Sequence, residues 1–352
     1  MGTTIANLWI PAVWVQSMRE RMAHFPALWN SGVVATSELF NAIATGQGIN
    51  ANIPFLYDIS DQLDEVQVED TSPVNDNAQP GAVVVAAICN RVYKASSNAL
   101  SKQLSGAMPM AAIIDTMVPR RLKQRQTTLI NVFHGLFGTG GNANANAALQ
   151  ACRYAGVNGQ EVFTENGAGA QSVNLIDPDK IIDTSALLGE LEDALRAGAM
   201  LCHQNVKARI RKLDRLNFRT LVMQSQLPWT IEAYCDVPIF TSDYLARPGQ
   251  QSGYVYDTYF MAKGTVAYGE KPQQGDTNDV ASLQYFRNRD LNQELIWDRT
   301  RFMLGINGVS YNGQPANPNN GPANAEFAQP GAWALKFQSA NRVGITSIRT
   351  NG

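Results

Sequence analysis

The stretch SGAMPMAAIIDTMVPRRLKQRQTTLINVFHGLFGTGG, residues 105–141, contains the clearest structural signal in the sequence. Ser105 and Gly106 precede Pro109, a residue that is tolerated in the first turn of a helix, and the pattern stops between Gly135 and Gly141. Between these limits, apolar residues recur at spacings of three, four or seven, which predicts one face of a helix about thirty residues long. These apolar residues are Ile114, Val118, Leu122, Leu129, Phe133 and Leu136.

The middle of this predicted helix is the most basic part of the first half of the chain. Four cations follow Pro119: Arg120, Arg121, Lys123 and Arg125. A second basic run ends a predicted helical block over about 187–215, with a spacing that is typical of an exposed helix face. Its cations are Lys207, Arg209, Arg211, Lys212 and Arg215.

The segment before the long helix predicts a two-stranded ribbon. Ile53, Phe55 and Tyr57 alternate with other residues as in a strand, and an apolar run begins at Val83 after a turn-rich tip. Between the two strands the chain carries a cluster of acids and no Lys or Arg. Because an isolated ribbon is only marginally stable, we expect it to rest on another surface. The acids are Asp58, Asp61, Asp64, Glu65, Glu69 and Asp70.

This acidic cluster has two alternative interpretations. Paired carboxylates could act in catalysis, and clustered acids could bind calcium. The cluster lacks the D-x-D-x-D-G spacing of a calcium loop, and no motif places a second acid beside it. A charged ribbon that faces solvent or a neighbouring molecule is therefore the better interpretation.

The sequence contains none of the common catalytic or nucleotide-binding motifs. GxxxxGK[ST], GxGxxG after a strand, HExxH and GxSxG are all missing. Cys202 and His203 are adjacent, but neighbouring residues on a helix point about 100° apart and cannot form a local catalytic pair. The four cysteines are scattered without a CxxC, which indicates reduced thiols in a cytosolic setting. We therefore expect no catalytic, cofactor-binding or metal-binding residues.

Charge is scarce in this chain. Of its 352 residues only 16% are charged, against about 25% in a typical globular protein, and the net charge is -2. No stretch approaches the roughly 18 apolar residues that a membrane helix needs, and the first ten residues lack the basic start of a signal peptide. The near-neutral balance disfavours a free-standing nucleic-acid binder. Low charge is instead consistent with a large homo-oligomer, because the cores of interfaces are depleted in charged residues.

The remaining segments complete the predicted order of elements. A short helix is expected over 30–50, irregular surface structure over 139–174, and strands over 237–240, 254–261, 265–268 and 296–304. The first thirty residues are rich in large apolar side chains, which need a surface to lie against. These are Trp9, Trp14, Met18, Met22, Phe25 and Trp29.

Taken together, this order of pieces resembles the major capsid proteins of tailed bacteriophages, whose fold is shared with herpesvirus coats and encapsulins. The resembling pieces occur in the family's order over almost the whole chain. They are WIPAVW (9–14), NSGVV (30–34), PMAAIID (109–115) with TLINVFHGLF (128–137), DVPIFTSD (236–243), GTVAYG (264–269), DRTRFMLG (298–305) with GVS (308–310), and NP (317–318) with NAE (324–326).

The resemblance implies an α+β fold with five parts. An N-terminal arm and short helix would occupy 1–49, and an extended E-loop ribbon 50–93. A peripheral domain with a long spine helix and a Gly/Asn-rich insertion would occupy 94–179. An axial domain would follow over 180–280, and 281–352 would contain a return strand of the peripheral domain and the C-terminal segment.

The resemblance also implies a structural protein rather than an enzyme. Subunits of the family form hexamers and pentamers that close an icosahedral head shell around double-stranded DNA. The implied partners are further copies of the chain, a portal, a separate scaffolding protein, decoration proteins and weakly contacted DNA, with no membrane and no cofactor. The implied location is the virion, after assembly in the host cytoplasm. An encapsulin-like compartment is the alternative within the same fold, and a cytosolic enzyme using carboxylates of 58–70 is the alternative from another class.

Some members of the family crosslink their shells through a Lys in the E-loop, but the first Lys of this chain is Lys94, at the base of the ribbon. That crosslink is therefore not expected. We expect instead that the acidic ribbon lies over the basic helix segment of a neighbour, and that Trp9 and Trp14 also contact other subunits. The expected contact residues are Asp58, Asp61, Asp64, Glu65, Glu69 and Asp70 on one side and Arg120, Arg121, Lys123 and Arg125 on the other.

Overall fold

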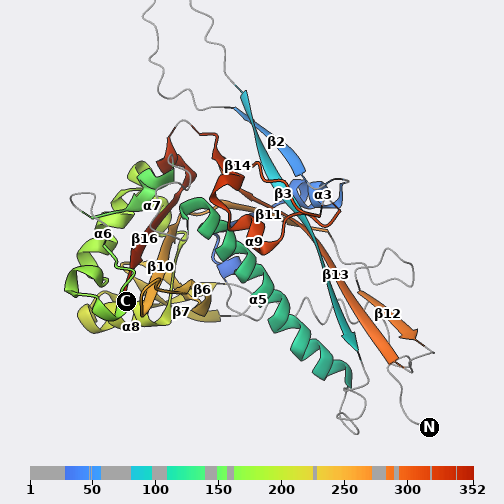
Figure 1. Ribbon diagram of the computed structural model, residues 1–352, viewed down its shortest axis with the longest axis horizontal. Helices are drawn as coiled ribbons and strands as arrows, with labels where there is room; N and C mark the ends of the chain where they lie inside the picture. Colours follow the sequence, from blue (N-terminus) through green and yellow to red (C-terminus); the bar gives the residue numbers. More distant parts are fainter. Residues whose placement is uncertain are drawn as a thin grey trace, which may run out of the picture.

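The long helix expected within 105–141 is present as α5 (Pro109–Phe137), which runs through the middle of the molecule (Figure 1). The computed structural model describes residues 28–46, 48, 50–56, 81–96, 109–138, 149–156, 162–224, 228–271, 283–288, 293–317, 319–337 and 339–352. Two sheets pack around the second half of α5. No described helix is long and apolar enough to cross a membrane.

The first sheet is built around one long strand, β13 (Gln293–Ile306). One edge of β13 pairs with β11 (Val266–Glu270) and β12 (Leu283–Asn288), and the other pairs with β3 (Gly81–Ser96), all antiparallel. The sheet continues from β11 to β1, and from β13 through β14 to β15. These three short strands are β1 (Val34–Thr36), β14 (Val309–Tyr311) and β15 (Trp333–Leu335).

A short helix, α3 (Glu38–Thr45), lies against the first sheet and confirms the helix expected over 30–50. The Ser37 side chain caps it by accepting a hydrogen bond from the Phe40 backbone N–H, and Gly46 ends it. The backbone of Phe40 approaches β11 so closely that a Cβ added at Gly269 would lie 2.1 Å from the Phe40 carbonyl oxygen. Glycine therefore permits the close packing of α3 on the sheet.

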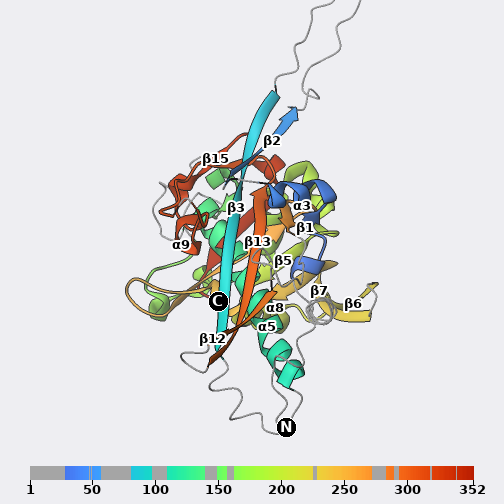
Figure 2. The same ribbon diagram turned by 90° about the vertical axis from the view of Figure 1, so that its right-hand side faces the viewer.

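The expected ribbon is present as β2 (Asn50–Leu56) and β3, which project from the body of the molecule (Figures 1 and 2). The antiparallel register runs from Asn50 opposite Ala87 to Leu56 opposite Gly81. From Ala87 onward, β3 pairs with β13 instead. One unbroken strand therefore belongs to the ribbon at one end and to the first sheet at the other.

The second sheet has the strand order β4-β16-β10-β5-β8-β7-β6, with β9 paired to β10. Successive residues of a strand point to opposite faces. In β5, Met200 and Cys202 face a core shared with α6 and α8, whereas Ala199 and Leu201 face the core shared with α5. Its strands are β4 (Arg153–Tyr154), β5 (Ala199–Cys202), β6 (Phe218–Gln224), β7 (Pro228–Tyr234), β8 (Val237–Thr241), β9 (Ala246–Pro248), β10 (Tyr254–Met261) and β16 (Ile345–Thr350). The covering helices are α6 (Pro178–Ala186), α7 (Glu192–Leu195) and α8 (Gln204–Leu213).

The second half of α5 is the centre of the main core. The rings of Phe133 and Phe137 lie 5.1 Å and 5.9 Å from that of Tyr259 on β10. On another side, α9 (Asn324–Phe327) packs against α5 at Gly135, where an added Cβ would lie 2.0 Å from the Phe327 carbonyl oxygen. The apolar face predicted from spacing is therefore the face that joins the two sheets and α9.

The structure confirms the strands expected over 237–240, 254–261, 265–268 and 296–304, which are β8, β10, β11 and β13. The single helical block expected over 187–215 is wrong in its middle, because β5 separates α7 from α8. All four residues of β5 are buried. A strand that is covered on both faces shows no alternation of apolar and polar residues, so its pattern cannot be distinguished from that of a buried helix.

The structure corrects the expectation that 139–174 is irregular surface structure. Leu149 and Cys152 are buried, and β4 pairs with β16. Each sheet is assembled from segments far apart in the chain: the first combines β1 with β11 and β13, and the second combines β4 with β16 and β10.

Candidate intersubunit surface

Arg121, expected at an intersubunit contact, is buried inside the subunit. Its side chain is 4% exposed and that of Asp298 on β13 is 3% exposed. The guanidinium group donates from Nε to Asp298 Oδ2 at 2.7 Å and from Nη2 to Oδ1, so the pair is bidentate. This corrects the expectation for Arg121, because a cation that neutralises a buried carboxylate of its own chain is not available to a neighbour.

Arg125 is also occupied within the subunit. Its guanidinium group pairs with Glu270 of β11, which also accepts a hydrogen bond from the Tyr268 hydroxyl at 3.1 Å. The guanidinium carbon lies 5.4 Å from the centroid of the Tyr268 ring. Together with Arg121, it fastens the middle of α5 to the first sheet.

The other two cations point outward. Arg120 and Lys123 are exposed. The guanidinium carbon of Arg120 lies 3.3 Å from the centroid of the Tyr93 ring on β3, and Lys123 Nζ lies 5.4 Å from that of the exposed Tyr244. These two side chains, the outward cations, are what the basic segment offers to a partner.

Helical spacing is consistent with the inward direction of Arg121 and Arg125, but it does not separate the two pairs, because the exposed Lys123 also lies seven residues before the buried Ile130. Arg125 lies seven residues after Val118 and seven before Val132, and both valines are buried. Arg121 lies seven residues before Thr128, which is also buried. Seven residues are close to two helical turns, so both arginines are in phase with the buried face of α5.

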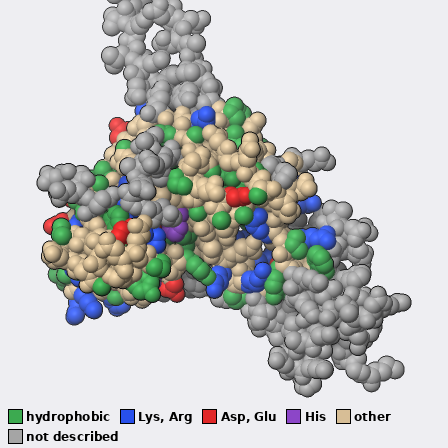
Figure 3. Space-filling view, in the orientation of Figure 1, with side chains coloured by type: hydrophobic (Ala, Val, Ile, Leu, Met, Phe, Trp, Pro, Cys, Tyr) green, Lys and Arg blue, Asp and Glu red, His purple; other side chains and the backbone are tan. Residues whose placement is uncertain are grey.

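The remaining expected contact residues lie outside the described residues. These are Trp9 and Trp14 of the terminal arm and the six acids of the ribbon, Asp58, Asp61, Asp64, Glu65, Glu69 and Asp70. Val83, in the ribbon part of β3, is 45% exposed, and Val92, in the part paired with β13, is 56% exposed. In the coloured part of Figure 3, Lys, Arg, Asp and Glu side chains form small scattered patches.

A second group of buried charges joins the end of α5 to the second sheet. Asp257 of β10 accepts a hydrogen bond from Arg349 Nε of β16 at 2.5 Å, and Arg349 also donates to the Gly138 carbonyl oxygen. His134 Nε2 lies 3.5 Å from Asp257 Oδ2.

Burial alone would raise the pKa of Asp257, but the positive charges of Arg349 and then His134 outweigh burial and hold that pKa below its usual range. Burial lowers the pKa of His134, so this imidazole is neutral near pH 7.

A fall in pH is expected to lower the free energy of unfolding of the unassembled subunit, because His134 binds a proton more readily in the unfolded chain. Because its pKa is lower in the folded state, the unfolded chain binds more protons as the pH falls from about 7 to about 5, and stability is lost over that window. Asp257 adds a further loss below about pH 4, where its carboxylate is protonated in the unfolded chain. In urea unfolding, His134→Gln should lose less stability between about pH 7 and about pH 5 than the wild-type chain. Equal losses in the two proteins would contradict this account.

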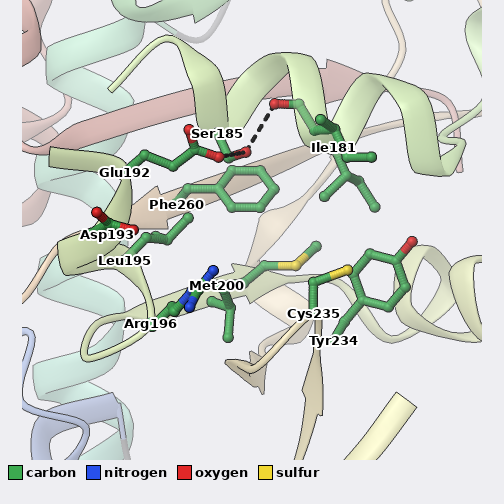
Figure 4. A pocket seen from close by; sticks show the side chains of 12 residues that line it. Ile181, Ser185, Glu192, Asp193, Leu195, Arg196, Met200, Tyr234, Cys235 and Phe260 are labelled. Atoms are coloured by element: carbon green, nitrogen blue, oxygen red, sulfur yellow. Dashed lines mark hydrogen bonds between the residues drawn. The ribbon is translucent and has the colours of Figure 1, made fainter. Parts of the chain in front are cut away.

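A cavity of about 320 Å³ opens between α6, α7 and the β7–β8 turn (Figure 4). Its lining is largely apolar, with Glu192 and Asp193 at one end and Cys235 at the other. Ser185 donates a hydrogen bond to Glu192 at 3.1 Å. Burial raises the pKa of the Cys235 thiol, so it is not an activated nucleophile. Within the described ranges, no three His, Cys, Asp or Glu side chains gather as a metal site would require.

No protein-family profile matches the chain. The major capsid protein of Bacillus phage SPP1 is 23% identical to it over 336 residues, which cover 94% of this chain and 93% of that protein. Among solved structures, the capsid of Ralstonia phage GP4 aligns with a TM-score of 0.54 at 8% identity, covering 92% of this chain and 88% of that one. The chain has the fold of a tailed-phage capsid protein. The cyanophage Pam1 capsid aligns with a TM-score of 0.48 at 10% identity, over 80% of this chain and 87% of that one. The fold shared with the capsid of Ralstonia phage GP4 confirms the resemblance and the α+β class expected from the order of the sequence pieces.

Proposed function

We propose that this chain is a major capsid protein, the subunit that assembles into the head shell of a tailed phage. The similarity to a phage major capsid protein carries this proposal, because it extends over 94% of the chain. The capsid fold is likewise matched over 92% of the chain, so both similarities concern the whole molecule. In this role the protein is structural and catalyses no reaction.

In this proposal, hexamers and pentamers of the chain close an icosahedral shell around double-stranded DNA. The shell assembles in the host cytoplasm with a portal and a scaffolding protein, and the protein is then part of the virion. Exposed apolar side chains support association with further copies, because neighbours can bury them. The most exposed of them are Leu216 at 92%, Leu39 at 64% and Val173 at 60%.

Negative-stain microscopy of the purified chain, expressed alone and with the scaffolding protein of its phage, tests this function. We expect closed shells of uniform diameter. A species of tens of kilodaltons that never assembles under either condition would overturn the proposal. Shells that enclose a cargo enzyme and have no portal vertex would instead indicate an encapsulin-like compartment.

We further propose that the acidic ribbon of one subunit lies over the outward cations, Arg120 and Lys123, of its neighbour. The ribbon segment carries acids and no Lys or Arg between its two strands. Arg121 and Arg125 take no part, because their charges are neutralised within the subunit. Exposed ion pairs contribute at most about 1 kcal/mol each, so they would set the register of neighbours while apolar contacts hold the shell.

Reversal of the outward cations, Arg120→Glu with Lys123→Glu, is expected to impair assembly without unfolding the subunit. Acids on both sides of the contact repel each other, whereas neither cation contributes to the buried core. The measurements are shell yield by microscopy and unfolding of the unassembled subunit. A matched control reverses the exposed Arg196 and Lys212 near the second sheet, which changes the net charge equally. Wild-type shell yield from Arg120→Glu with Lys123→Glu would exclude this contact.

A further inference from the structure

At the base of the ribbon, the guanidinium group of one arginine donates to four carbonyl oxygens of the described residues. Arg301 of β13 donates from Nε to the Ala44 carbonyl at 2.8 Å and from Nη2 to the carbonyls of Gly46 and Gly48, the latter at 2.9 Å. Its Nη1 donates to the side-chain carbonyl of Asn90 on β3 at 3.3 Å. We call this set of contacts the carbonyl clamp.

The carbonyl clamp joins three elements at the point where the ribbon leaves the body. Ala44 is in the last turn of α3, and Gly46 and Gly48 lie in the turn that leads to β2. Helix ends leave carbonyl groups without partners, and a cation there also interacts favourably with the helix dipole. Arg301 therefore fixes the turn before β2 to β13 and β3 together.

A second set of contacts holds β3 beside the clamp. The Asn90 backbone N–H donates to the Asn320 carbonyl at 2.9 Å, and its side chain donates to the Asn319 carbonyl at 2.9 Å. Arg91 donates to the Pro322 carbonyl. Gly321 has a φ of +70°, and an added Cβ would lie 2.0 Å from the Ile88 carbonyl oxygen, so only glycine fits here. Residues 319–322 thus contact β3 directly. The contact lies just beyond Ala87, where β3 stops pairing with β2 and continues along β13.

We propose that Arg301 is a positioning residue for self-assembly, which fixes the direction in which the β2–β3 ribbon leaves the subunit. This inference rests on the proposed function. β3 is held by its ladder with β13, and β2 is held by its pairing with β3 and by a small apolar cluster in which Ala51 lies with Ala44 and Met303. Neither of these contacts fixes the turn before β2, which Arg301 ties to β13 through its hydrogen bonds to Gly46 and Gly48. Arginine suits this role because its planar fork presents five donors on three nitrogens in fixed directions, whereas a lysine ammonium group presents three donors from a single nitrogen.

The test compares Arg301→Gln, Arg301→Lys and, as a matched control, Arg196→Gln on the exposed surface near the second sheet. Shell diameter by negative-stain microscopy separates positioning from stability. A destabilised subunit gives fewer shells of normal diameter, whereas a misdirected ribbon gives shells of altered or mixed diameter. We expect mixed diameters from Arg301→Gln, partial recovery from Arg301→Lys, and wild-type shells from Arg196→Gln. Wild-type yield and diameter from Arg301→Gln would overturn the proposal.

If the wild-type chain forms no shells, that result counts against the proposed function and not against the role of Arg301. Hydrogen exchange of the unassembled subunits then tests the role of Arg301. Amides of residues 44–56 are expected to exchange faster in Arg301→Gln than in the wild-type chain, while those of the second sheet exchange equally. Unchanged protection over 44–56 would overturn the inference. If Arg301→Gln does not fold, Arg301→Lys supplies both readouts.

Discussion

Arg121→Ala is expected to lower the free energy of unfolding by about 3–5 kcal/mol, because removal of one partner leaves the other charge buried and unpaired. The side chain of Asp298 is only 3% exposed in the folded chain, so little water reaches its carboxylate. Urea unfolding of the unassembled subunit, followed by tryptophan fluorescence, measures the loss. The matched control is Arg120→Ala, one residue away on the exposed face, which should cost about 1 kcal/mol or less because it removes only a contact with Tyr93.

The double variant Arg121→Met with Asp298→Leu tests the physical cause of that loss. Apolar residues of similar volume often replace a buried ion pair at little cost, so most of the stability lost in Arg121→Ala should return. A loss below about 1 kcal/mol in Arg121→Ala would show that Asp298 finds water or another partner, contrary to the structure. A double variant as unstable as Arg121→Ala would show that shape, not charge, dominates at this site.

Gly135→Ala is expected to destabilise the protein, although helix propensity alone predicts a gain of about 1 kcal/mol. The added methyl group would lie 2.0 Å from the Phe327 carbonyl oxygen and 2.6 Å from Trp333 Nε1. Trp333 Nε1 donates to that same carbonyl at 2.8 Å, so the methyl group would enter an existing hydrogen bond. Overpacking of this kind typically costs about 1–3 kcal/mol and separates α9 from α5.

Gly331→Ala is the matched control, because an added Cβ at Gly331 meets no atom within 4 Å. Its stability should stay within about 0.5 kcal/mol of the wild-type value. Thermal unfolding of both variants decides the matter. A stabilised Gly135→Ala protein would mean that α9 does not pack against α5 as described.

The fold was predictable where its signals are local. The spacing of Val118, Leu129 and Phe133 predicted α5, and the acidic turn-rich segment between two apolar runs predicted the ribbon. β5 was missed because a fully buried strand of four residues has the same composition as part of a helix. The pairing of β4 and β16 could not be predicted, because no local sequence pattern indicates which distant segments share a sheet.

The orientation of the four cations expected at the contact was not predictable from their run in the sequence. Two of them, Arg121 and Arg125, pair with acids of their own chain. Charged side chains are seldom buried, so composition alone favoured four exposed cations. The partners of Arg121 and Arg125 are Asp298 and Glu270, which lie far along the chain. No pattern near the two arginines in the sequence indicates these partners.

Because β3 is one continuous strand, a small change in its direction at the body moves the far end of the ribbon. The seven residues from Ala87 to Gly81 span roughly 20 Å in an extended strand, so a tilt of about 5° at Ala87 displaces the far end by about 2 Å. Displacements of that size are comparable to the spacing of atoms in a packed contact. In the proposed shell, where each subunit would meet many identical copies at the same angle, the greatest precision would be required at the base of the ribbon, where the carbonyl clamp, residues 319–322 and β13 meet.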